Sequence, residues 1–176
     1  QAEARFFDGM FAHDLLIGLD YKHYSLHDNQ GTNFAAGYTV PGLSLLNPIY
    51  GQIRGRPAPY LVNADTFQQL GIYAQDQIKL TDRLTLVLGG RQDFADNVVR
   101  DRLSPANSSS RSDEAFSGRA ALIYNFPEGL APYVSYSTSF QPQIGSDANG
   151  QSYAPEYGEQ VEVGVKFEPV GYGFFL

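Results

Sequence analysis

The chain has 176 residues, a hydrophobic content of 43% and a net charge of −7 at neutral pH, which is enough for one domain with a sizeable core. The negative charge and the lack of any Lys and Arg cluster exclude a nucleic-acid partner, and zero cysteines exclude disulfides and thiolate metal sites. No stretch approaches the roughly eighteen apolar residues of a membrane helix, whereas 12 Tyr, 12 Phe and 18 Gly are typical of a β-rich chain with many turns.

The first part of the chain predicts two strands and a long loop. Residues 1 to 7 are expected to end one strand, which turns at Asp8-Gly9. In residues 12 to 26 the side chains at odd-numbered positions are mostly apolar and those at even-numbered positions are mostly polar, as on the two faces of a half-buried strand. Residues 28 to 64 hold Gly, Pro and Asn without sustained periodicity, so they predict a long loop.

The clearest pattern is a hairpin over residues 69 to 93. Leu70, Ile72 and Ile78 share one parity, and the polar Gln75 and Lys79 share the other. After the short polar corner at 81 to 83, apolar and polar residues alternate again up to residue 94. Each arm runs over about ten residues or more, against the five or six that are usual for strands of soluble domains.

Three further strands are predicted in the second half of the chain. They lie at about 115 to 126, 131 to 140 and 158 to 168, and another strand begins at Tyr172. The connections between the predicted strands alternate between long, at 28 to 64, 95 to 114 and 141 to 157, and short, at 81 to 83, 127 to 129 and 168 to 171.

This alternation of long and short connections favours an antiparallel up-and-down meander in a transmembrane β-barrel. A strand of about ten residues crosses a bilayer when tilted, and such barrels have short turns on one side and long loops on the other. Charged residues on the polar parity suit a watery lumen. Aromatic side chains near the strand ends are expected to form interfacial girdles, with Tyr21, Phe94, Phe116 and Tyr136 on the outer side.

Several segments resemble the barrel of TonB-dependent siderophore receptors of Gram-negative outer membranes. They are LGIYAQDQIKLTDRLTLVLGGRQD, APYVSYSTSFQPQ and YAPEYGEQVEVGVKFEP, together with HDLLIGLDY at 13 to 21 and NPIYG at 47 to 51. The resemblance covers roughly residues 13 to 168, in the order of the family.

The resemblance implies a barrel of about 22 strands whose lumen is filled by an N-terminal plug. Residues 1–176 would supply about six or seven of these strands and no plug domain, as a sector of the barrel. The implied function is active transport of ferric siderophores across the bacterial outer membrane, energised by a TonB complex that acts through the absent N-terminal region. The implied partners are the siderophore, TonB and outer-membrane lipid. Iron arrives inside its siderophore, so the chain needs no cofactor of its own.

Candidate ligand-binding residues lie in the predicted loops and at their edges. Tyr and Arg combine a large rigid area with a polar end, and the resemblance implies that extracellular loops and the upper wall contact the siderophore. The residues predicted for this role are Tyr50, Tyr60, Phe140, Gln141, Tyr153 and Tyr157, and further candidates are Tyr38, Arg54 and Arg56. The alternative for each is an aromatic or basic residue that only packs its loop. A second set is expected on the lumen wall, where it can touch the plug: Arg91, Arg119, Glu162 and Lys166.

Metal binding and catalysis are not expected. His23 and His27 are about 13 Å apart along a strand, too far for two ligands of one ion. Ser135, Ser137 and Ser139 form a ladder on the polar parity, but no His and Asp occupy the chain contexts of a hydrolase. The sequence therefore predicts no enzyme.

Two other classes of protein share the strand pattern. A passive porin or an adhesin barrel would need no plug, and a soluble all-β binding domain would use the apolar faces as the core of a sandwich.

Overall fold

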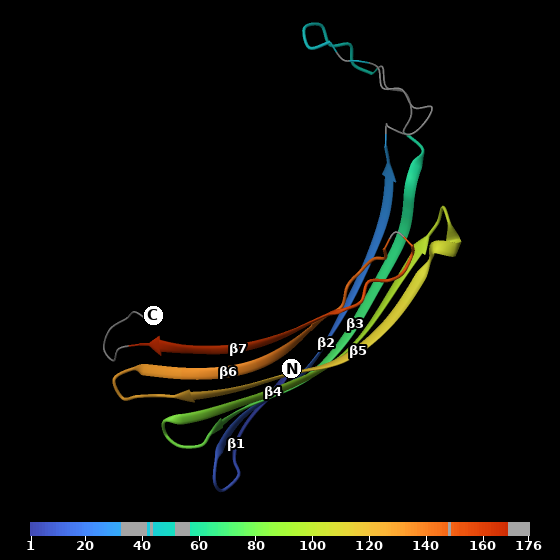
Figure 1. Ribbon diagram of the computed structural model, residues 1–176. Coiled ribbons are helices and arrows are strands. Elements are labelled where there is room, and N and C mark those ends of the chain that lie inside the picture. Colours follow the sequence, from blue (N-terminus) through green and yellow to red (C-terminus); the bar gives the residue numbers. More distant parts are fainter. Residues whose placement is uncertain (33–41, 43, 52–56, 148, 169–176) are drawn as a thin grey trace.

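The computed structural model shows one antiparallel sheet of seven strands in the order of the sequence (Figure 1). It describes residues 1–32, 42, 44–51, 57–147 and 149–168. Each strand pairs with its neighbours in the chain, which confirms the predicted meander. The strands are β1 (Ala2–Phe7), β2 (Ala12–Gly31), β3 (Pro59–Lys79), β4 (Leu84–Asp101), β5 (Ser109–Tyr124), β6 (Leu130–Gln141) and β7 (Glu156–Phe167).

The sheet is curved into a crescent and is not closed on itself (Figure 1). The short turns at 8–11, 80–83 and 125–129 lie at one end of the sheet, and the ends of β2 and β6, from which the long connections start, lie at the other. In the described part of the chain no helix is long and apolar enough to cross a membrane. The predicted strand that begins at Tyr172 lies outside the described residues.

The predicted loops at 28 to 64 and 95 to 114 are too long. β2 continues to Gly31 and β3 already begins at Pro59, while β4 continues to Asp101 and β5 begins at Ser109. Only residues 102–108 connect β4 and β5, and they contain the short 3-10 helix η1 (Pro105–Asn107). The alternation of apolar and polar residues fades in these strand ends because neither face is consistently apolar, and adjacent pairs such as Leu61-Val62 and Val98-Val99 place apolar residues on both faces, so periodicity could not detect the strands.

The two faces of the sheet distribute apolar and polar side chains in the reverse of the way a soluble protein does, because the large apolar side chains are exposed. We call the face that carries Arg91 the inner face; in β3, β4 and β5 every buried side chain lies on it. The outer face carries large apolar side chains that are exposed: Ile17, Leu19, Leu70, Ile72, Leu88, Phe116, Leu122, Val134, Val161, Val163 and Val165. Such a sheet is suited to lipid outside and to a filled polar lumen inside.

The register places an aromatic band across the outer face. Tyr21 is paired with Leu70, and Leu70 is paired with Phe94, so the two aromatic residues lie at one level. Phe116 lies on β5 two residues beyond Glu114, which is the residue paired with Phe94, and is therefore the next side chain on the same face. Beyond this band, toward the long connections, the outer face turns polar. The apolar zone thus has an edge that aromatic residues mark, as at a membrane interface.

Candidate functional site

A charged network occupies the middle of the inner face. Arg91 donates from Nε and Nη2 to the two carboxylate oxygens of Asp93, at 2.7 Å each, and from Nη1 to Asp20 at 2.5 Å. Asp93 is only 3% exposed and also accepts a 2.7 Å hydrogen bond from Gln69. One guanidinium therefore links β2 to β4 and satisfies a carboxylate that has almost no access to water.

Two glycines make room for this network. A Cβ on Gly71 would lie 1.8 Å from Nη2 of Arg91, and a Cβ on Gly18 would lie 2.4 Å from the ring of Tyr73. The guanidinium also lies 5.9 Å from the centre of the Tyr73 ring. The long side chains can thus lie flat along the wall, because the neighbouring strand carries no side chain at these points.

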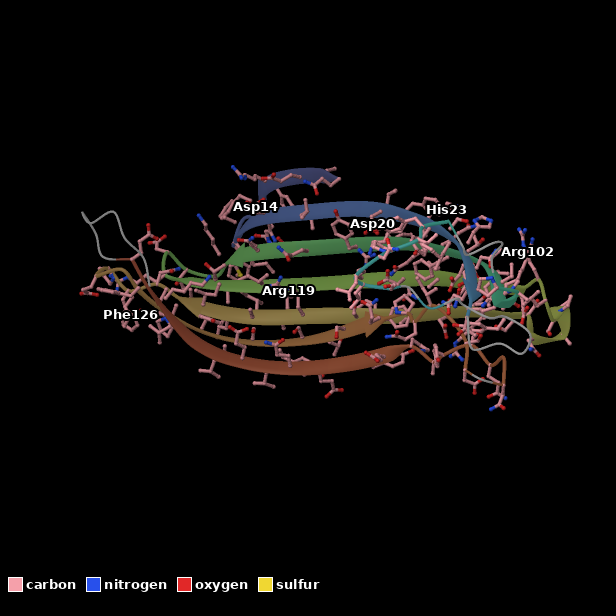
Figure 2. All side chains as sticks on the ribbon, turned by 90° about the horizontal axis from the view of Figure 1, so that it is seen from above. Asp14, Asp20, His23, Arg102, Arg119 and Phe126 are labelled. Carbon is pink, nitrogen blue, oxygen red and sulfur yellow. The ribbon has the colours of Figure 1, made fainter. Side chains whose placement is uncertain are left out.

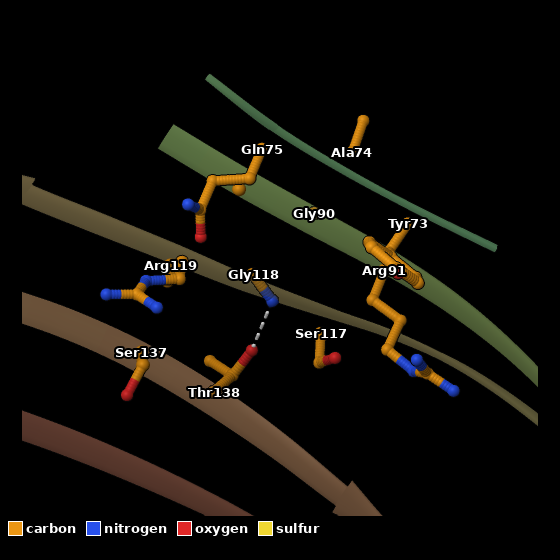
Figure 3. Close-up of a pocket in the computed structure, with 11 residues that line it drawn as sticks. Tyr73, Ala74, Gln75, Gly90, Arg91, Ser117, Gly118, Arg119, Ser137 and Thr138 are labelled. Carbon is orange, nitrogen blue, oxygen red and sulfur yellow. Dashed lines mark hydrogen bonds between the residues drawn. The ribbon is translucent and has the colours of Figure 1, made fainter. Parts of the chain in front are cut away.

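A shallow pocket of about 280 Å³ lies beside the network (Figure 3). It is lined by the long side chains of Tyr73, Gln75, Arg91 and Arg119 around small residues of β4, β5 and β6. Backbone pairing between β5 and β6 spans only Arg119 to Ile123 on β5. Where pairing stops, the Thr138 hydroxyl accepts a 2.9 Å hydrogen bond from the Gly118 amide instead. In the described part of the chain Arg119 forms no ion pair.

The connection at 142–155 folds onto the inner face near its upper end. The Asn97 side-chain amide of β4 donates to the Gln143 carbonyl at 3.3 Å, and the Ser152 and Ser109 hydroxyls are 3.0 Å apart. Gly150 has φ +78°, and a Cβ there would meet the Asn107 carbonyl oxygen at 3.0 Å. These contacts bring the β6–β7 connection against the top of the β4–β5 hairpin, more than 40 residues earlier in the chain.

A cavity of about 390 Å³ lies between this connection and the ends of β3 and β4. We call it the upper cavity. Its lining combines two tyrosines, Tyr60 and Tyr153, with the polar side chains of Asn63, Asp101 and Asp147. Val99 is 2% exposed and forms part of the lining.

Of the predicted ligand-binding residues, the structure brings Tyr60 and Tyr153 together at the upper cavity. Phe140 and Tyr157 contact each other, with ring centres 5.5 Å apart, on the outer parity of β6 and β7. Gln141 ends β6 on the inner parity, and Tyr50 is 81% exposed in the segment 44–51, at the far end of the molecule. Tyr38, Arg54 and Arg56 lie outside the described residues.

The four residues predicted for the lumen wall share the inner face. Arg91 and Arg119 belong to the pocket of Figure 3, and Figure 2 shows Asp20 and Arg119 along the same stretch of the sheet. Glu162 accepts a 2.5 Å hydrogen bond from the Tyr133 hydroxyl, and Lys166 lies 5.6 Å from the centre of the Tyr133 ring.

Sequence reasoning missed the polar residues that complete these groups. Asp20 and Asp93 share the parity of the lumen wall, so their proximity to Arg91 could have been inferred once the register was known. Asn63 and Asp101 stood inside predicted loops, although they are a cross-strand pair. In the described residues no group of three or more His, Cys, Asp or Glu side chains is arranged to hold a metal ion.

Two backbone N–H groups hold the Asp147 carboxylate in the wall of the upper cavity. The backbone N–H groups of Gln151 and Asn149 donate to this carboxylate at 2.8 and 2.9 Å, and they hold its pKa below the ordinary value of 3.8. Because the pKa is lower in the folded turn than in the unfolded chain, the ionised carboxylate stabilises the turn at pH values above the ordinary pKa. This stabilisation is lost as the pH falls through the folded pKa.

We therefore expect the turn at 147–151 to loosen as the pH falls below about 3.8. The measurement is hydrogen exchange of the Gln151 amide, corrected for the intrinsic effect of pH. In the variant Asp147→Asn, which cannot titrate, the protection should not change with pH. An identical acid-dependent loss in both proteins would assign the effect to another group.

Comparison with known proteins places the whole chain in one group. The model of the family described as "TonB dependent receptor-like, beta-barrel" matches residues 2–175. The ferrioxamine B receptor of Salmonella typhimurium is 38% identical over 165 residues, which are 93% of this chain and 22% of the receptor. The ferrichrome outer membrane transporter/phage receptor of Escherichia coli K12 is 34% identical over 177 residues, 96% of this chain and 23% of the transporter.

Solved structures share the fold. The ferric-catecholate import receptor Fiu from E. coli K12 superposes with a TM-score of 0.71 at 18% identity, over 96% of this chain and 28% of the receptor. The ferric citrate transporter FecA gives a TM-score of 0.71 at 15% identity, over 94% of this chain and 23% of the transporter. The chain thus spans less than a quarter of the length of the sequence relatives named above.

Proposed function

The chain belongs to the TonB-dependent receptor β-barrel family, and we propose that it is a sector of a receptor that takes up ferric siderophores. Proteins of this family are β-barrels of the bacterial outer membrane, and this chain is an outer-membrane protein of that family. The observation that carries the proposal is the reversed sheet, with large apolar side chains outside, a buried polar network inside and a cavity beneath a long connection at one end.

The ligand that we propose is an iron(III) trihydroxamate. Two of the relatives are named for ferrioxamine B and for ferrichrome, which belong to this class of siderophore. The iron is cargo inside the complex, so the binding surface needs to recognise the organic shell rather than to ligate the metal. We propose Tyr60 and Tyr153 of the upper cavity as contacts, with Tyr50, Phe140, Gln141 and Tyr157 as further contacts of the extracellular side.

Three further partners follow from this proposal. Outer-membrane lipid covers the apolar outer face. A plug domain fills the lumen and contacts the wall at Arg91, Arg119, Glu162 and Lys166. A TonB complex supplies the energy through the N-terminal region of the complete receptor. The family consists of receptors and transporters, and we assign no catalytic step and no resident cofactor to the chain.

A passive porin or adhesin and a soluble binding domain are both disfavoured by membership of the family. Uptake of radiolabelled iron separates a TonB-dependent receptor from a porin. The complete receptor is expressed in a bacterial strain that lacks its own receptors for ferric trihydroxamates. We expect uptake of the ferric trihydroxamate that disappears when the TonB gene is deleted. Uptake that persists without TonB would identify a passive pore, and no uptake with any ferric siderophore would contradict the proposal.

A further inference from the structure

Three buried side-chain oxygens near the upper end of the inner face have no hydrogen-bond partner in the described part of the chain. They are the Oδ1 atoms of Asn63 and Asp65 on β3 and the Oδ1 atom of Asn97 on β4. Asp65 is 9% exposed and Asn97 is 5% exposed. Nearly all buried polar atoms of folded proteins have a partner, so three such oxygens together favour a bound ligand.

The three side chains occupy neighbouring positions on one face of the sheet. Asn63 and Asp65 are two residues apart on β3, so both side chains are on the inner face. Asp65 is paired with Val99, and Asn97 precedes Val99 by two residues on the same face of β4. Residues in such diagonal positions are about 7 to 8 Å apart, close enough for their side-chain oxygens to share one small ligand.

Asp65 is a buried carboxylate without a counter-charge among the described residues. Phe67 and Val99, which are 7% and 2% exposed, flank it on the inner face, so its surroundings are largely apolar. No described Lys, Arg or His side chain forms an ion pair with it. Asp28, which is paired with Asn63 on β2, adds a second negative charge nearby. A carboxylate buried in this way destabilises the fold unless a positive charge compensates it.

The basic residues of this region serve other partners or lie on the other face. Arg111 of β5 is opposite Asn97, but its Nε atom donates to the two carboxylate oxygens of Asp113 at 2.9 and 2.8 Å. Arg100 lies on the outer parity of β4. Arg102 directly follows β4 and forms no ion pair with a described residue. The sequence of the β6–β7 connection contains no Lys, Arg or His. Asp65 therefore depends on a positive group from outside these strands.

A hard metal cation matches both the charge and the kind of oxygen atoms. A water molecule can donate to about two of the three oxygens and brings no charge. Calcium takes about 6 to 8 oxygen ligands, from carboxylates, amide side chains, backbone carbonyls and water, at roughly 2.3 to 2.6 Å. These distances are shorter than those of an N–H···O hydrogen bond, so the ion needs less room than an ammonium group. Because two of the three oxygens come from amides, the group differs from a cluster of three His or acidic side chains, of which the described residues contain none.

We propose that Asn63, Asp65 and Asn97 bind a calcium ion that ties β3 and β4 to the β6–β7 connection. Asn97 holds that connection through a 3.3 Å hydrogen bond from its amide nitrogen to the Gln143 carbonyl, and coordination through Oδ1 fixes the orientation of the same amide. Asn63 also lines the upper cavity, from which the ion and its water ligands can reach the group. The inference goes beyond the proposed uptake function, because the ion is part of the wall and is not cargo.

The test measures calcium binding to the purified complete receptor. The receptor is kept in detergent without lipopolysaccharide, whose phosphates would bind calcium themselves, and is first treated with a chelator. Calcium chloride is then titrated in at constant ionic strength and followed by calorimetry. Asp65→Asn removes the one charge of the group and should weaken binding roughly ten-fold. Asn63→Asp keeps the shape and adds a carboxylate, so it should tighten binding by a similar factor. Glu114→Gln is the matched control, because Glu114 is an exposed acidic residue on the outer face, and it should leave the affinity unchanged.

The stability of Asp65→Asn separates an ion site from an acidic residue that is merely buried. Thermal unfolding of the variant and of the unmodified receptor is measured once with chelator and once with calcium. With chelator we expect the variant to unfold at the higher temperature, because it lacks the uncompensated buried charge. With calcium the order should reverse, since only the unmodified receptor is stabilised by binding the ion tightly.

Several outcomes would overturn the ion site. These are an unmodified receptor that binds no calcium, an affinity that is the same in Asp65→Asn and Asn63→Asp, and an order of stability that does not change between the two solutions. If Asp65→Asn does not fold, the affinity of Asn63→Asp decides, and binding that is not tighter than in the unmodified receptor contradicts the proposal. None of these measurements uses a siderophore, so failure of the ion site leaves the proposed uptake of ferric trihydroxamates as it stands.

Discussion

Replacing Arg91 with Met is expected to destabilise the barrel by about 3 kcal/mol, because it leaves the buried Asp93 without its counter-charge. Arg91 is the donor in all of the ion pairs that Asp93 and Asp20 form in the described part of the chain. Loss of one partner of a buried pair costs more than the pair itself contributes, since the remaining carboxylate is neither hydrated nor neutralised. The estimate is at the low end of the known range because the guanidinium keeps some contact with water.

The measurement is urea-induced unfolding of the complete receptor, folded into lipid vesicles. Arg119→Met is the control, since Arg119 lies on the same face and has no ion pair with the described residues. It should change the free energy of unfolding by no more than about 1 kcal/mol. Equal losses in the two variants would show that the charge network contributes nothing beyond the packing of an arginine side chain.

Introducing a charged side chain on the outer face should lower the free energy of unfolding by a similar amount. The same substitution at the next residue in the chain, which faces inward, should have little effect. Val134 lies between Leu122 and Val163 on the outer face, and Ser135 lies between Ala121 and Glu162 on the inner face. We expect Val134→Arg to destabilise the barrel by about 2 to 4 kcal/mol, since it buries a guanidinium in the hydrocarbon. Ser135→Arg should cost less than about 1 kcal/mol, because its side chain enters a polar lumen beside a carboxylate.

This comparison tests which face of the sheet meets lipid. Both variants are unfolded in vesicles and also in a detergent micelle, where a guanidinium reaches water more easily. The penalty for Val134→Arg should shrink in the micelle. If Ser135→Arg were the more destabilised of the two, the assignment of the faces would be reversed.

The sequence alone was sufficient for the strands that cross the apolar zone. Leu70, Ile72 and Ile78 repeat every second residue because one face of each such strand needs apolar side chains. The same reasoning failed for 97 to 101, where β4 continues although Val98 and Val99 lie on opposite faces and no alternation is left. Backbone pairing with β3 and β5 holds this part in place, and pairing between distant segments leaves no periodic signal.

The candidate site was predictable only in part. Tyr60 and Tyr153 were predicted individually, as aromatic residues of loops, and the structure places both at one cavity. Their proximity depends on two facts that local sequence does not hold. One is the register that sets Asn63 opposite Asp101, and the other is the fold of the connection that places Gly150 against Asn107.

The unequal lengths of the strands have a consequence for the height of the barrel wall. β3 has 21 residues and β4 has 18, whereas β6 and β7 have 12 each. Since the short turns lie at one end, the surplus of β3 and β4 extends the wall above the aromatic band, with a polar outer face and an inner face that the 142–155 connection partly covers. The rim of the receptor is therefore low over β6 and β7 and high over β3 and β4. The upper cavity, lined by residues at the tips of β3 and β4, thus lies high on this taller part of the wall and not at the level where the backbone pairing of β5 with β6 stops.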